Sequence, residues 1–281
     1  MALTPNMNNQ ITPGEPQLTD RSTSKNWIIL TFTILVGSAG LIPVPFIDEF
    51  IALQLKRRMV YSLARLSKVD ISRGEISQLA GSSYPGWSGG CLSTITYPMR
   101  EAFREVLPWL EWRRAINLAT ETYYTGVLFW EILSSGSFQP GQAREYRIVI
   151  KRVQTGADLR LVASLIEKTF KTGGKNIATT YSWIWRFFYH YYKQSGRYLL
   201  VKTRSLVSKR LSHRAFVKLL NRMEKLDPEQ LIENARPEVN QLTGKLVQNL
   251  NGGLGTLGPE HISLLRQRLF AELYQAGLLS K

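Results

Sequence analysis

Residues 26–47 read NWIILTFTILVGSAGLIPVPFI and contain no charged side chain. The length suits a membrane, because a bilayer core needs about 20 apolar residues in one continuous helix. Gly40, Pro43 and Pro45 interrupt the segment near its end, and a proline inside a helix costs about 3 kcal/mol of helix stability. We therefore expect the segment to associate with a membrane, and to bend rather than to continue as one straight helix.

The bend has a defined local chemistry. Two prolines separated by one residue hold the backbone extended, and Asp48 can accept amide hydrogen bonds from a helix that begins near Glu49. The two arms are expected to form an apolar helical hairpin that brings Lys25 and residues 56–58 to one side, which is cytoplasmic under the positive-inside rule. The predicted membrane turn consists of Gly40, Pro43, Pro45, Phe46 and Asp48.

Apolar periodicity after the turn predicts further helices. We expect an amphipathic helix over residues 50–69 and then a short helix that begins with a cap in residues 69–72. A third helical region is expected over residues 99–133. Its second half is apolar but includes Glu121 and Glu131. Because acidic side chains are costly near a bilayer centre, this half is expected to pack against the first apolar segment.

Positive charge is concentrated in one block. Residues 151–225 hold 17 Lys/Arg and three Asp/Glu, a net charge of +14, whereas the whole chain of 281 residues carries +15. Such a block attracts phosphate, either of lipid head groups or of nucleic acid, although a solvated helix face is the ordinary alternative. The predicted phosphate or lipid contacts are Arg186, Lys202, Arg204, Lys209, Arg210 and Arg214.

Aromatic side chains are densest in the same block. Residues 181–192 read YSWIWRFFYHYY. A narrow polar stripe is formed by residues three or four positions apart, with aromatic side chains around the rest of the helix; its members are Ser182, Arg186, His190, Lys193 and Arg197. Such a helix either packs in a core or lies at a membrane interface, where Trp and Tyr are favoured. The predicted interfacial aromatics are Trp183, Trp185 and Tyr189.

These patterns predict an all-α protein, in which the apolar helical hairpin region is followed by a basic, aromatic-rich helical domain. Within the basic domain, residues 146–153 alternate enough for a short strand or the start of a helix, and Gly173 and Gly174 mark a break between helices. The predicted parts are a flexible polar tail over residues 1–25, an apolar membrane-associating region over residues 26–135 and the basic domain over residues 142–281.

The turn resembles a known pattern. Gly40, Ile42, Pro43, Pro45, Phe46 and Asp48 match the Gly-x-Ile-Pro-x-Pro-Phe-x-Asp signature of domain of unknown function 697. That apolar helical domain is found in bacteria, often beside Era-like GTPase domains. The resemblance covers about residues 27–68, and the chain departs from the family in Glu49, in the pair Arg57 and Arg58, and in having no GTPase domain. It implies membrane association and a separate GTPase as a partner, and it brings no catalytic residues.

Signals of catalysis or metal binding are weak. The single cysteine, Cys91, cannot close an intramolecular disulfide, and the three histidines have no second ligand at metal-binding spacing. Gly253, Gly255 and Gly258 match G-x-G-x-x-G, but no strand leads into them, so they predict a flexible loop rather than a dinucleotide site. We expect no catalytic residues, no metal and no cofactor.

The sequence favours a membrane-associated helical scaffolding or regulatory protein that is not an enzyme. It is expected to bind anionic lipid at the cytoplasmic face of a membrane. The alternative is a nucleic-acid-binding protein, in which the cations of residues 151–225 neutralise phosphates and Trp183, Trp185 and Tyr189 stack on bases. The aromatics are interleaved along the helix in a way that favours packing over display on a groove.

Overall fold

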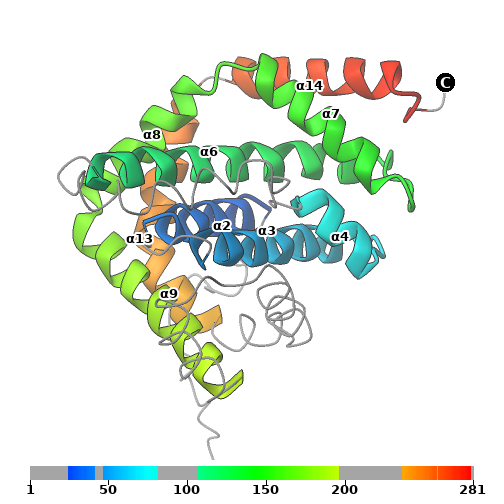
Figure 1. The fold of residues 1–281 in the computed structure, drawn as a ribbon. Helices are drawn as coiled ribbons and strands as arrows, with labels where there is room; N and C mark the ends of the chain where they lie inside the picture. The colour runs from blue at the N-terminus through cyan, green and yellow to red at the C-terminus, as the bar shows by residue number, and fades with distance from the viewer. Residues whose placement is uncertain (1–24, 42–46, 82–106, 196–235, 258, 280–281) are drawn as a thin grey trace, which may run out of the picture.

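Every secondary-structure element in the described part of the chain is a helix (Figure 1), which confirms the predicted all-α class. The computed structural model describes residues 25–41, 47–81, 107–195, 236–257 and 259–279. Its helices are α2 (Lys25–Ala39), α3 (Ile47–Leu66), α4 (Arg73–Ala80), α6 (Leu107–Ser134), α7 (Ala143–Gly156), α8 (Arg160–Thr172), α9 (Gly174–Ser195), α13 (Arg236–Gly255) and α14 (Pro259–Gln275).

Helix α2 is the central element of the core. All 12 residues from position 28 to position 39 are buried, as expected for a helix that is apolar on every side. The helix lies between α3 and α6 (Figure 1) and also contacts α13 and α9. The apolar side chains that suggested a membrane segment are thus covered by other helices of the same chain. Among the described helices, none combines the length and the apolar character needed to cross a bilayer.

Glycine allows α2 to approach its neighbours closely. A Cβ atom at Gly37 would lie 2.5 Å from Phe170 Cζ and 2.9 Å from the Cβ of Ala119. A Cβ atom at Gly40 would lie 2.9 Å from the Cα of Ala115. All three distances are shorter than a van der Waals contact between carbon atoms. The packing of α2 against α6 confirms that the second half of the 99–133 region is the partner of the apolar segment.

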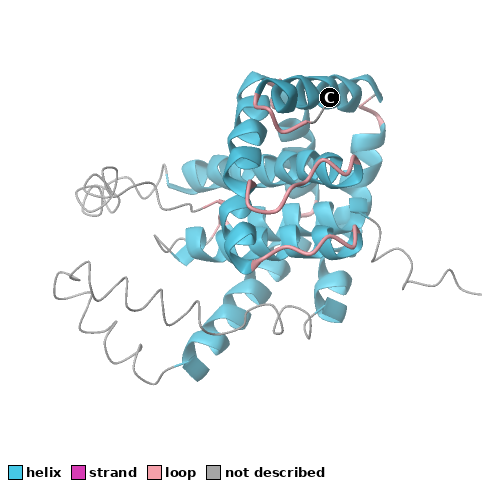
Figure 2. Ribbon diagram, turned by 90° about the vertical axis from the view of Figure 1, so that its right-hand side faces the viewer, coloured by secondary structure: helices cyan, strands magenta, loops and turns pink. Residues whose placement is uncertain are grey.

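The helices that surround α2 also pack against one another. Helix α4 joins α3 to α7, α14 packs on α7, and α13 crosses α8 and α9, so the helices stack in successive layers (Figure 2). A single hydrophobic cluster extends from Ile28 to Leu278. Helices from both sides of residues 135–142 therefore contribute to this cluster, and α9 and α13 contact α2. The division of the chain at these residues stays a prediction.

Several predicted local features are confirmed. Ser72 caps α4, since its hydroxyl accepts from Glu75 N at 3.3 Å and the Glu75 carboxylate accepts from Ser72 N at 2.9 Å. This reciprocal pair is a capping box. The break at Gly173 and Gly174 separates α8 from α9. Residues 146–153, which allowed a strand or a helix, lie in α7.

Two predicted boundaries are wrong. Helix α3 begins at Ile47, so Asp48 lies in its first turn and not at the position before a helix that starts near Glu49. Gly253 and Gly255 lie in α13, not in a loop. The helix continues to Gly255 because it packs on α8, where the nearest side-chain atom to an added Gly253 Cβ is Leu165 Cδ2 at 3.2 Å. Tertiary contacts of this kind override a weak local preference.

Candidate functional site

The structure describes only part of each predicted site. Gly40 lies at the end of α2 against α6, and Arg186 is exposed on α9. Trp185 and Tyr189 belong to α9 and Asp48 to α3, but their side chains are outside the description. Trp183 lies in α9 and is half-buried. The remaining predicted site residues lie outside the described ranges, namely Pro43, Pro45, Phe46, Lys202, Arg204, Lys209, Arg210 and Arg214.

Helix α8 presents positive charge on its exposed face. Arg160, Lys168 and Lys171 are exposed and share this face, because positions i, i+8 and i+11 of a helix point in similar directions. The opposite face is anchored in the core by Ile166 and Phe170, both fully buried. Of these three cations only Lys171 forms an ion pair within the helix, with 2.7 Å between its Nζ and a carboxylate oxygen of Glu167.

Helix α9 continues the same pattern. Lys175, Ser182 and Arg186 are exposed on one face, while Ile177 and Ile184 are buried on the other. Ser182 and Arg186, two members of the predicted polar stripe, both lie on this exposed face. The two helices follow one another along one edge of the molecule (Figure 1, left).

We call the exposed cations of α8 and α9 the basic surface; they are Arg160, Lys168, Lys171, Lys175 and Arg186. Within the described ranges, no carboxylate lies within 4.0 Å of four of these cations, Lys171 being the exception. The charge of Arg160, Lys168, Lys175 and Arg186 is therefore not neutralised by ion pairs of the described chain, and it is available to an anionic partner.

The cations of α3 are used differently. Lys56 is buried, and its Nζ lies 3.1 Å from a carboxylate oxygen of Glu121 on α6. Arg57 donates to Ser77 Oγ at 2.6 Å, and the Arg58 guanidinium lies 5.0 Å from the centre of the Tyr61 ring. The sequence suggested that these cations flank a membrane hairpin, whereas in the structure each has a partner within the chain.

Trp183 also has a partner within the chain. Its indole N–H donates to a carboxylate oxygen of Glu238 on α13 at 2.8 Å, and its ring packs partly buried against the core. This contact ties α9 to α13. The role of an interfacial aromatic stays a prediction for Trp183, as it does for Trp185 and Tyr189.

Metal binding has no support in the described residues, because no three His, Cys, Asp or Glu side chains among them lie close enough together to hold an ion. His261 instead contacts Tyr124, with 2.9 Å between Nε2 and the phenolic oxygen.

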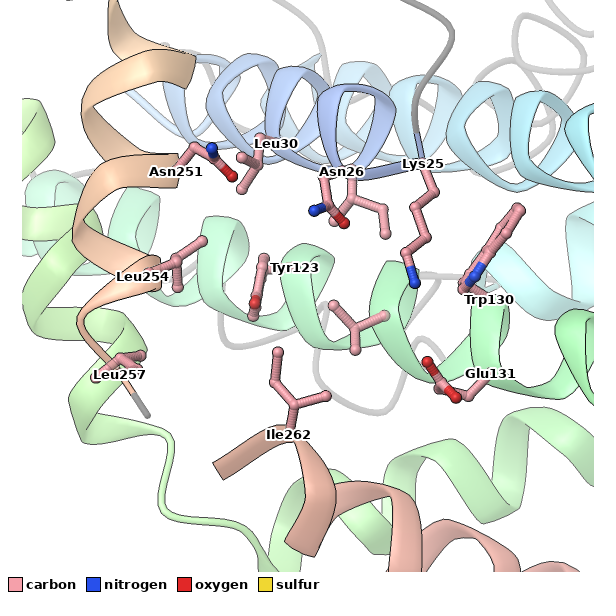
Figure 3. Close-up of a pocket in the computed structure, with 13 residues that line it drawn as sticks. Lys25, Asn26, Leu30, Tyr123, Trp130, Glu131, Asn251, Leu254, Leu257 and Ile262 are labelled. Carbon is pink, nitrogen blue, oxygen red and sulfur yellow. The ribbon is translucent and has the colours of Figure 1, made fainter. Parts of the chain in front are cut away.

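The structure also contains a cleft that the sequence did not predict. A cleft of about 400 Å³ opens between α2, α6, α13 and the start of α14 (Figure 3). Apolar side chains such as Ile29, Leu30 and Ile262 line it together with Lys25 and Tyr123. The only local signal is the spacing of Tyr123, Val127, Trp130 and Glu131, which places them on one face of α6. That spacing alone does not distinguish a cleft wall from a core.

Comparison of the chain with protein-family models, with curated proteins and with solved structures found no match. The resemblance of residues 27–68 to domain of unknown function 697 therefore stays a prediction.

Proposed function

We propose that the protein is a helical scaffolding or regulatory protein that attaches to an anionic lipid surface through its basic surface. The observation that supports this function best is the set of exposed cations on α8 and α9 that have no carboxylate partner in the described chain. Each basic side chain near an anionic membrane contributes about 1 kcal/mol of binding free energy. The strongly positive stretch that follows α9 in the sequence adds to the same attraction.

The proposed contact is peripheral. Residues 28–39 are covered by α3, α6, α9 and α13, so the proposal assigns the lipid contact to α8 and α9 and not to α2. Attraction between exposed charges is screened by salt. Binding is therefore expected to weaken steeply as ionic strength rises. A separate GTPase as a protein partner rests on the sequence resemblance alone.

The test is co-sedimentation of the full chain with vesicles of phosphatidylcholine, with and without phosphatidylglycerol. Reversing three cations of the basic surface in the triple variant Lys168→Glu, Lys175→Glu and Arg186→Glu is expected to lower the partition coefficient for the anionic vesicles at least a hundredfold, because about 3 kcal/mol of attraction is lost. Binding to neutral vesicles is expected to be weak for both proteins.

A matched control reverses three exposed cations on other helices, in the variant Arg65→Glu, Arg144→Glu and Lys245→Glu. It changes the net charge by the same amount and is expected to retain most of the vesicle binding. Equal losses in the two variants would show a general charge effect and contradict the proposed surface. Salt-sensitive binding of single-stranded RNA, together with no binding to anionic vesicles, would favour the nucleic-acid alternative.

A further inference from the structure

The cleft between α2, α6, α13 and α14 has an apolar interior. Ile29 and Leu30 from α2 are 3% and 2% exposed, and Leu254 and Ile262 complete the wall from α13 and α14 (Figure 3). A volume of about 400 Å³ lies in the range of sites for small organic ligands, which are usually lined by apolar side chains with a few polar groups. The interior therefore suits the apolar body of a small ligand.

The cleft offers one cation at its edge. The Lys25 ammonium lies 5.6 Å from the centre of the Trp130 ring, and no carboxylate of the described chain lies within 4.0 Å of it. Glu131 also lines the cleft, but its carboxylate is 3.2 Å from Arg266 Nε and is thereby neutralised. The charge that remains for a ligand is positive, so the cleft favours an anion.

Tyr123 supplies a second polar group inside the cleft. The residue is 6% exposed, and its hydroxyl points toward Ile262 (Figure 3). In the described chain no acceptor is bonded to this hydroxyl, and its oxygen is not fully buried, so a ligand in the cleft can reach it. Burial raises the pKa of Tyr123 to about 12, so the phenol is neutral at pH 7 and can donate a hydrogen bond.

The Lys25 ammonium and the Tyr123 hydroxyl are separated along the cleft, which Asn26 and Asn251 also line. Tyr123 and Trp130 are two turns apart on α6, which corresponds to a rise of about 10 Å, and Lys25 lies over Trp130. A ligand that uses both groups needs an anionic end and an oxygen acceptor about 10 Å away. Apolar carbon between these two points matches the apolar lining of the cleft, to which Ile29 and Val127 belong.

We propose that this cleft binds a free aliphatic carboxylate that carries an oxygen function near the other end of its chain, such as a medium-chain hydroxy acid. The carboxylate lies at Lys25 and the distal oxygen accepts from the Tyr123 hydroxyl. This site is separate from the basic surface and does not depend on membrane attachment.

The test is isothermal titration of the full chain with 10-hydroxydecanoate and with decanoate. The natural protein is expected to bind the hydroxy acid about fivefold more tightly, because only this acid can accept the phenolic hydrogen bond. Lys25→Gln is expected to weaken binding of both acids about tenfold. Tyr123→Phe is expected to weaken binding of the hydroxy acid alone, and thus to make the two affinities equal.

The control Lys245→Gln removes an exposed lysine of α13 that does not line the cleft and is expected to change neither affinity. Absence of saturable binding of both acids would overturn the site. An equal loss of both affinities in Tyr123→Phe would overturn the role of its hydroxyl. If Lys25→Gln instead lowered binding to phosphatidylglycerol vesicles and left the free acids unaffected, the anion would be a lipid head group and the proposed ligand would be wrong.

The two proposals fail independently. The triple variant of the basic surface is expected to lose vesicle binding and to retain its affinity for 10-hydroxydecanoate. Retained vesicle binding in that variant contradicts only the proposed function, and loss of acid binding in Lys25→Gln with normal vesicle binding supports only the cleft.

Discussion

Lys56 of α3 and Glu121 of α6 form an ion pair of 3.1 Å in which the two side chains differ greatly in exposure, at 4% for the lysine and 46% for the glutamate. The buried lysine therefore needs the ion pair to compensate its charge, whereas the half-exposed glutamate can be solvated by water. A buried charge that loses its partner is costly, whereas replacing a whole buried ion pair with apolar groups of similar size is often neutral. Because the Glu121 side chain is 46% exposed, water can solvate its carboxylate when the lysine is removed.

The first prediction follows from this asymmetry. Glu121→Gln leaves the Lys56 ammonium buried without a carboxylate. It is expected to lower the free energy of unfolding by about 2 kcal/mol, which is less than for a fully buried ion pair because the glutamate side of this pair is exposed to solvent. Lys56→Met is expected to stay within about 1 kcal/mol of the natural protein. Urea denaturation of both variants measures the difference. A larger loss in Lys56→Met would contradict this account of the pair.

The second prediction concerns the contact of α2 with α6 and α8. Gly37→Ala is expected to destabilise the protein by about 1 to 3 kcal/mol, because the new methyl group overlaps Phe170 and Ala119. Gly244→Ala is the matched control in α13, where the nearest atom to the added Cβ is Trp27 Cη2 at 3.9 Å. Since alanine favours helix more than glycine does, Gly244→Ala is expected to stabilise the protein by about 0.5 to 1 kcal/mol.

Thermal unfolding of the two glycine variants gives the comparison directly. Gly37→Ala is expected to lower the stability and Gly244→Ala to raise it, so the two variants should differ from the natural protein in opposite directions. Stabilisation by Gly37→Ala would mean that α2 does not approach α6 and α8 as closely as the structure shows.

The third prediction concerns pH. Hydrogen bonds from Ser72 and from the Gly141 backbone lower the pKa of Glu75 below its ordinary value of 4.5. A lowered pKa in the folded state stabilises the protein above the unfolded-state value, and this contribution is lost as pH falls through the folded-state value. Glu75→Gln is therefore expected to be less stable than the natural protein at pH 7, by about 1 kcal/mol or less.

The difference between Glu75→Gln and the natural protein is expected to disappear as the pH falls below 4.5 and through the lowered pKa of Glu75. Urea midpoints measured from pH 7 to pH 3 test this. Glu145→Gln, at an exposed position on α7, is the charge-matched control and is expected to have little effect at pH 7. A stability difference for Glu75→Gln that does not vary with pH would show that its charge is not the cause.

The fourth prediction compares adjacent tyrosines on α6. The Tyr124 hydroxyl lies 2.9 Å from His261 Nε2 and donates to the Asp158 carbonyl at 3.4 Å, whereas the Tyr123 hydroxyl has no partner in the described chain. Tyr124→Phe is expected to cost about 1 kcal/mol and to speed amide hydrogen exchange at the start of α14. Tyr123→Phe is expected to change stability by less than about 0.5 kcal/mol. Equal costs would indicate that the Tyr123 hydroxyl is bonded.

Local chemistry alone determined much of the secondary structure. Apolar spacing predicted helices over residues 50–69 and 99–133, residues 69–72 predicted the cap at the start of α4, and Gly173 with Gly174 predicted the break before α9. The polar stripe through Ser182 and Arg186 also followed from helical spacing. Features of this kind depend on residues within a few positions of one another, so they can be read from a short segment.

The surroundings of those helices were decided by tertiary structure. Residues 28–39 are apolar whether they face lipid or protein, because the hydrophobic effect is not directional; α9 and α13, which are distant in the sequence, cover them. The burial of Lys56 likewise depends on Glu121 in another helix. The cleft combines Lys25 with Tyr123, Leu254 and Ile262 from four helices, and only the packing of the whole chain brings those side chains together.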